Sequence, residues 1–142
     1  MRYGLMVKKP HARVLAEKHP TLKIVIAHLG QPTPQAEADP DRGQLWQEQI
    51  DLGCLPNVCF DTAALPAYLP QEMFPYPSAA RYLQLALHRI GPAKILWGTN
   101  VRVLHHATYP QLLRLGQLHT QGLSPTEQAL VLGGNATQVF GH

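Results

Sequence analysis

The sequence predicts an α/β fold in which parallel strands alternate with helices. Three short runs rich in β-branched and other apolar residues lie at 22–28, 57–61 and 93–97, each flanked by proline or glycine. These runs are almost continuously apolar, which suits strands covered on both faces of a parallel sheet. Segments with helical spacing of apolar residues separate the runs, and this order is typical of right-handed βα units.

The expected elements can be placed in chain order. A fourth strand candidate at 3–7 opens the chain, so that a strand followed by a helix occurs four times. The 13 prolines and 11 glycines are spread along the chain and divide it into short blocks. Helices are expected at 11–19, 41–53, 78–90, 109–118, 124–132 and 135–140.

Local signals indicate where several of these helices begin and end. Ser124 and Glu127 have the spacing of a capping box, with proline at the first helical position between them. Ser78 and Asp41 are the expected caps of their helices. The pair Gly133-Gly134 is expected to end one helix before Asn135 begins the last.

Composition limits the classes of partner. With 142 residues the chain is long enough for one domain. Twelve basic and nine acidic residues give a net charge of +3, too weak a positive field to predict binding of nucleic acid. No apolar run approaches the roughly 20 residues of a membrane span, and the two cysteines match neither a disulfide framework nor a zinc finger. A cytoplasmic protein without nucleic-acid or membrane partners is expected.

Five polar residues follow the expected strands, where the active sites of parallel α/β folds lie. His28 closes the strand at 22–28, and Asp61 ends the strand at 57–61. Asn100 follows the glycine after the strand at 93–97, and His105 and His106 lie beyond it. Long proline-rich loops at 31–43 and 62–77 also follow strands, which favours a functional mouth at this end.

Each of these residues has an alternative interpretation. A lone histidine such as His28 is more often structural, and Asp61 can cap the start of a loop. Asn100 is also a common turn residue. Adjacent side chains diverge, so at most one of His105 and His106 is expected to face a site.

Four blocks in order resemble the C-terminal half of the amidohydrolase-related family. They are HPxLKIVIAHLG at 19–30, PNVxFDTA at 56–63, ILWGTN at 95–100, and LSxxE with LGGNA and a phenylalanine over 123–140. The resemblance implies a partial (β/α)₈ TIM barrel, with about four βα units, strands 5–8 of the barrel, in residues 1–142. It also implies a metal-dependent hydrolase, decarboxylase or lactonase that acts on a small carboxylated or lactone substrate.

The same resemblance suggests roles for the candidate residues. His28 corresponds to the histidine that binds the divalent metal, Zn²⁺ or Mn²⁺, or faces the substrate. Asn100 stands at the position of the family's catalytic aspartate, and a neutral amide cannot take a proton as that aspartate does. The positions of Asp61, His105 and His106 after the strands, rather than the resemblance, make them the expected substrate-binding residues.

The chain also departs from the family pattern. It contains no His-x-His, the motif that supplies two metal ligands in the family. His28 is then the single metal ligand left, and one ligand is too few for catalytic zinc. Three interpretations therefore stay open, two in which the chain is part of an enzyme and one in which it is not catalytic. The first is an enzyme whose other half comes from another chain or was lost from this sequence. The second is a non-catalytic half-barrel that self-associates or pairs with another chain, and the third is a metal-independent lactonase-like enzyme.

Overall fold

The computed structural model of the chain describes residues 9–33, 38–69, 72–100, 104 and 107–141. Within them, three parallel strands form one sheet in the order β1-β2-β3. They are β1 (Ile24–Ile26), β2 (Val58–Asp61) and β3 (Ile95–Leu96). Each lies within a run expected to be a strand, and the parallel pairing is confirmed. The strand expected at 3–7 lies outside the described residues.

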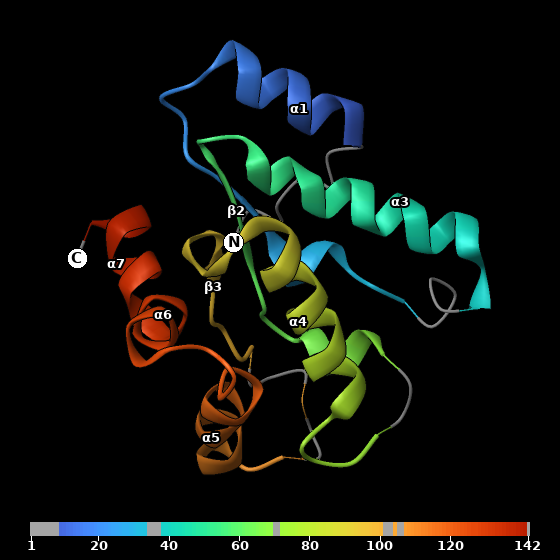
Figure 1. Ribbon diagram of the computed structural model, residues 1–142, viewed down its shortest axis with the longest axis vertical. Helices are drawn as coiled ribbons and strands as arrows, with labels where there is room; N and C mark the ends of the chain where they lie inside the picture. The colour runs from blue at the N-terminus through green and yellow to red at the C-terminus, as the bar shows by residue number, and fades with distance from the viewer. Residues whose placement is uncertain (1–8, 34–37, 70–71, 101–103, 105–106, 142) are drawn as a thin grey trace.

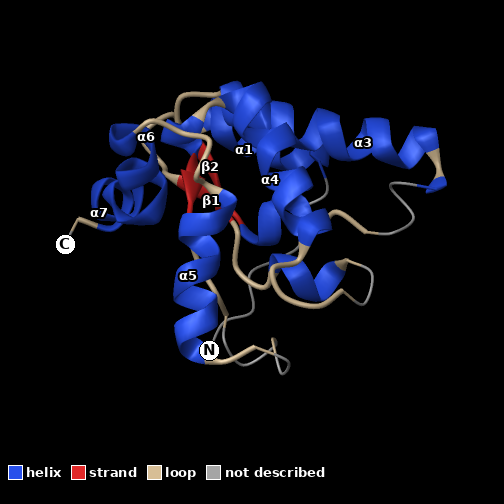
Figure 2. Cartoon of the chain, turned by 60° about the horizontal axis from the view of Figure 1, so that its bottom comes forward, coloured by secondary structure: helices blue, strands red, loops and turns tan. Residues whose placement is uncertain are grey.

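Helices alternate with these strands and pack around the sheet (Figures 1 and 2). The helix α3 packs against α4, and α4 packs against α5. The α-helices are α1 (Lys9–Lys18), α3 (Pro40–Ile50), α4 (Pro77–Ile90), α5 (Tyr109–His119), α6 (Pro125–Ala129) and α7 (Asn135–Phe140). Short helical turns are η1 (Ala27–Gly30), η2 (Asp51–Cys54), η3 (Leu65–Tyr68), η4 (Pro92–Lys94) and η5 (Leu130–Gly134). No helix in the described ranges is long and apolar enough to cross a membrane.

The core lies between the sheet and its helices. Phe60 and Ile95 are paired on neighbouring strands and are completely buried. Leu83 of α4 and Leu112 of α5 are also completely buried in this cluster. These side chains hold the two helices on the sheet through burial of apolar surface, and so fix the strand ends relative to one another.

Asparagine side chains join helices to strands at two places. The amide of Asn57 donates to the carbonyls of Ala16, His19 and Leu22 at 3.1, 3.0 and 2.9 Å, which ties the end of α1 to the start of β1. The amide of Asn135 donates to Pro92 and Ile95 at 2.7 and 2.8 Å. Both give backbone carbonyls hydrogen-bond partners where the chain changes direction.

The expected end of a helix at Gly133-Gly134 is wrong. Residues 130–134 form a π-helical turn that leads directly into α7, and both Gly134 and Asn135 have right-handed helical dihedral angles. Val131 within this turn accepts a hydrogen bond from the backbone N–H of Trp97 at 2.9 Å. The anchored amide of Asn135 and this bond to the strand hold the helix through a pair of residues that usually ends one.

Two of the expected caps also differ. Asp39, not Asp41, caps α3, because its carboxylate accepts the backbone N–H of Asp41 at 3.0 Å. In α4 the cap position is Tyr76, and Ser78 instead donates its N–H and hydroxyl to the carboxylate of Glu72. The capping box expected at the start of α6 is confirmed.

Candidate functional site

The chain leaves β1 through a left-handed turn. His28, Leu29, Gly30 and Gln31 have φ angles of 58°, 50°, 69° and 54°. The expected strand 22–28 therefore stops at Ile26, two residues early. For residues other than glycine, the left-handed region costs about 1–2 kcal/mol each. Such strain persists only where surrounding contacts hold it, and it is concentrated at functional sites.

Contacts from two other elements hold this turn. The carboxylate of Asp61, at the end of β2, accepts the backbone N–H of His28 at 2.9 Å. The indole Nε1 of Trp46 in α3 donates to the carbonyl of Leu29 at 2.9 Å, and the Leu29 side chain is completely buried. Trp46 is itself packed edge-on against Tyr82 of α4, with ring centroids 4.9 Å apart. The turn is thus fixed to both the sheet and the helical layer.

The imidazole of His28 has a defined orientation. Its Nδ1 lies 2.7 Å from the carbonyl oxygen of Ala63. Because a carbonyl only accepts, Nδ1 carries the hydrogen, and Nε2 of the neutral ring keeps its lone pair. The ring also lies against Tyr68, with centroids 5.1 Å apart and planes at 40°. A half-buried imidazole held in this way presents one nitrogen as an acceptor, as metal-binding histidines do.

The ends of the three strands meet around Ala63. Its N–H donates to Asp61 Oδ1 at 2.9 Å, and a Cβ added to Gly98 after β3 would lie 3.4 Å from the Cβ of Ala63. The next residue, Ala64, donates its N–H to the carbonyl of Thr99 at 3.2 Å. The structure therefore brings His28 and Asp61 together, as expected of residues at the carboxyl ends of neighbouring parallel strands.

Of the three remaining candidates, the structure describes only Asn100. Asn100 is exposed, four residues beyond the end of β3, and has a φ of 45°. Asparagine tolerates this conformation better than most residues, which agrees with its alternative interpretation as a turn residue. His105 and His106 lie outside the described residues.

The described residues supply fewer ligands than a catalytic metal needs. Among the residues described, no group of three or more His, Cys, Asp or Glu side chains is placed to hold a metal ion. A catalytic zinc site takes three protein ligands and leaves one position open. His28 has the chemistry of a single ligand, so the described residues do not by themselves fit a complete metal centre.

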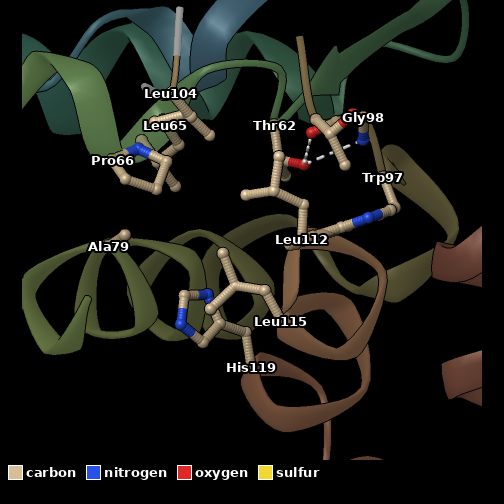
Figure 3. A pocket seen from close by; sticks show the side chains of 11 residues that line it. Thr62, Leu65, Pro66, Ala79, Trp97, Gly98, Leu104, Leu112, Leu115 and His119 are labelled. Atoms are coloured by element: carbon tan, nitrogen blue, oxygen red, sulfur yellow. Dashed lines mark hydrogen bonds between the residues drawn. The ribbon is translucent and has the colours of Figure 1, made fainter. Parts of the chain in front are cut away.

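A small cavity lies behind the strand ends, between the sheet, α4 and α5 (Figure 3). It has room for about one water molecule. Thr62 lines one wall, where its hydroxyl donates to the carbonyl of Gly98 and accepts the backbone N–H of Gly98. His119 lies on another wall, with its Nε2 2.6 Å from the carbonyl of Pro75. The cavity is mostly apolar and is too small for an organic substrate.

His119 shows no signal in the sequence, because nothing in the neighbouring residues indicates that it is buried. Only 5% of its surface is exposed. Burial lowers the pKa of His119, although the hydrogen bond to Pro75 acts in the opposite direction. Its ring stands edge-on to Trp97 at 6.3 Å. His119 therefore links α5 to the loop before α4 as a neutral imidazole.

Solved structures share the fold of this chain. An amidohydrolase from Burkholderia multivorans with bound HEPES has a TM-score of 0.80 at 21% identity, covering 93% of this chain and 49% of its own. The zinc-bound form of that protein has a TM-score of 0.78 at 20% identity, and the match covers 93% of this chain and 48% of that structure. A probable 2-pyrone-4,6-dicarboxylic acid hydrolase from Acinetobacter baumannii with citric acid bound gives 0.66 at 20%, with 96% and 51% covered. A 5-carboxyvanillate decarboxylase from Sphingomonas paucimobilis gives 0.52 at 17%, with 89% and 36% covered.

The chain thus spans about half the length of the first three of these structures. This likeness confirms the predicted fold class, a parallel α/β arrangement that forms part of a (β/α)₈ barrel. No curated protein matches the sequence. The sequence profile of the amidohydrolase family matches residues 6–142. The chain therefore belongs to the amidohydrolase family.

Proposed function

We propose that this chain forms one side of the active site of an amidohydrolase-type hydrolase, decarboxylase or lactonase. The substrate is a small carboxylated ring or a lactone. Two neighbours support this substrate class, because one is named a probable hydrolase of 2-pyrone-4,6-dicarboxylic acid and another a decarboxylase of 5-carboxyvanillate. Residues 1–142 then correspond to the C-terminal half of the barrel, and the chain alone is incomplete as a catalyst.

The observation that carries the proposal is the conformation of His28. Its backbone is left-handed, and hydrogen bonds at 2.9 and 2.7 Å fix its N–H and its ring. Strained backbone held by surrounding contacts is typical of active sites. The buried His119 also has a ring nitrogen bonded to a backbone carbonyl, so the left-handed backbone is the feature that distinguishes His28.

A divalent cation, Zn²⁺ or Mn²⁺, completes the proposed site. His28 would supply one imidazole ligand through Nε2, and the other ligands would come from outside the described residues. When bound, such an ion polarises a substrate oxygen or lowers the pKa of a bound water molecule. One of His105 and His106 is proposed to contact the substrate at the same mouth.

Asn100 differs chemically from the aspartate that the family resemblance places there. Its amide offers a carbonyl acceptor and two N–H donors, but it does not take a proton near neutral pH. We assign it to orienting the substrate at the reacting centre, which leaves the general base to another residue.

A non-catalytic half-barrel is the second candidate. It is favoured by the neutral amide at Asn100 and by the position of β1 and β3 at the two edges of the described sheet. Unpaired strand edges bind further strands. This candidate predicts self-association, or pairing with a chain that supplies the other half of the barrel, without turnover.

The test is an assay of the native assembly that contains this chain, with Zn²⁺ or Mn²⁺ supplied. We expect metal-dependent turnover of a panel of carboxylated pyrones, carboxylated phenols and sugar lactones, and less turnover by the isolated chain. Absence of turnover of the whole panel by the native assembly would overturn the enzyme proposal and favour the half-barrel.

A further inference from the structure

The hydrogen bonds around Asp61 form a closed ring that includes His28. Asp61 Oδ1 accepts the backbone N–H of His28 and that of Ala63, both at 2.9 Å. The carbonyl of Ala63 in turn accepts the Nδ1–H of the His28 imidazole at 2.7 Å. One carboxylate oxygen thus controls both the backbone of His28 and the group that orients its ring.

We propose that Asp61 is a positioning residue that sets the orientation and the tautomer of His28. The inference rests on the proposed place of His28 in the site. The position of Asp61 at the end of a strand predicted that it binds substrate, so the structure assigns this carboxyl group a different task. Asp61 acts through the backbone N–H groups of His28 and Ala63, and the imidazole bonds to the carbonyl of Ala63 instead of to the carboxylate.

The location of the ring explains why a positioning group is needed. His28 follows a strand of only three residues and lies in a left-handed turn, a conformation that is uncommon for residues other than glycine. Ala63 lies in a different loop, beyond β2. An acceptor shared between the two loops fixes their separation, and hydrogen bonds to a carboxylate are stronger than those to a neutral oxygen.

The group that accepts the Nδ1–H of His28 determines how Asp61 affects the ring. Where a carboxylate accepts the second N–H of a ligand histidine, it raises the basicity of the ring. Here the acceptor is an uncharged carbonyl, so Asp61 affects the geometry of His28 more than its basicity. A neutral side chain of the same shape at position 61 should then do most of the same work.

This reasoning distinguishes two substitutions. Asp61→Asn keeps an oxygen that accepts both N–H groups, whereas Asp61→Ala removes it. If Asp61 bound a substrate cation, a metal or a proton, both substitutions would be equally damaging. If Asp61 positions His28, Asp61→Asn should rescue most of what Asp61→Ala loses.

The test is nitrogen NMR of the full chain with labelled histidine, with the His28 signals assigned from the His28→Asn variant. Wild type and Asp61→Asn should show His28 protonated at Nδ1, and Asp61→Ala should show both tautomers in comparable amounts. A pure Nδ1–H tautomer in Asp61→Ala, or a mixture in Asp61→Asn, would overturn the proposal.

Hydrogen exchange gives a second measurement in case Asp61→Ala does not fold. The amides of His28 and Ala63 share one acceptor, so Asp61→Asn should speed their exchange together several-fold while the tautomer of His28 is kept. Unchanged exchange of both amides would overturn the proposal. Because neither readout needs turnover, an inactive protein with these NMR properties would contradict only the proposed function.

Discussion

Replacement of Trp46 by phenylalanine tests whether the helical layer holds the left-handed turn. Trp46 is 5% exposed, and its Nε1 donates to the carbonyl of the completely buried Leu29. Phenylalanine keeps an aromatic ring against Tyr82 but removes this donor. The Leu29 carbonyl then loses a partner inside the protein.

The size of the effect follows from these contacts. A buried acceptor without a partner costs about 1–3 kcal/mol. The smaller ring leaves a gap that adds roughly 1 kcal/mol, in the range of modest core truncations. Trp46→Phe should therefore lower the free energy of unfolding by about 2–4 kcal/mol.

Trp97→Phe is the matched control. This substitution changes the ring size in the same way as Trp46→Phe. The indole nitrogen of Trp97, however, has no hydrogen-bond partner in the part of the chain that the structure describes. Trp97→Phe should therefore lose only the packing contribution of about 1 kcal/mol. Urea unfolding followed by circular dichroism measures both variants. Equal losses would show that the Trp46 bond to Leu29 does not stabilise the turn.

Three further predictions follow from single contacts. Because burial lowers the pKa of His119, the unfolded chain binds this proton more readily than the folded one. The contribution of neutral His119 to the free energy of unfolding is therefore complete above about pH 6.5, and it is lost as the pH falls through the pKa of His119 in the folded protein. His119→Gln should flatten the pH dependence of the unfolding free energy, and an unchanged slope would contradict this prediction. The ammonium of Lys94 donates to three backbone carbonyls around the start of β2, so Lys94→Met should cost about 2–3 kcal/mol in urea unfolding, against little for the exposed Lys18→Met. In the native assembly, Asn100→Asp should raise both zinc affinity, measured by calorimetry, and the rate of hydrolysis, because it restores an anionic ligand and base; no change in either would mean that Asn100 does not stand at the aspartate position.

The sequence is informative where structure depends on neighbouring residues. The strand runs locate β2 and β3, and the spacing of Ser124 and Glu127 marks the start of α6. The continuous apolar character of the strand runs also predicts a parallel sheet, since helices cover both faces of such a sheet. Hydrophobic periodicity and capping are local, so no knowledge of the rest of the fold is needed to recognise them.

Sequence reasoning is weaker where structure depends on distant contacts. The left-handed turn at His28 needs Asp61, 33 residues away, and Trp46, 17 residues from the Leu29 carbonyl. The continuous helix through Gly133-Gly134 needs the bonds of Asn135 to a segment about 40 residues earlier. Local propensity opposes both features, and tertiary hydrogen bonds overcome it.

The candidate site shows the same division. His28 and Asp61 were both predicted to lie at the strand ends, because each is the last residue of a strand run. Their mutual arrangement was not predictable, because it passes through the backbone of Ala63, whose side chain carries no chemical signal. The roles of Asn100, His105 and His106 stay predictions.

The place of His28 in the active site is tested most directly by its own substitution in the native assembly. On the substrate turned over fastest, His28→Asn should lower kcat/KM by more than about 100-fold, since even loss of a group that only supports a metal ligand costs 10–100-fold. His88→Asn, at an exposed position on α4, should leave kcat/KM within about twofold of wild type. Equal kcat/KM for wild type and His28→Asn would contradict the assignment of His28 to the site.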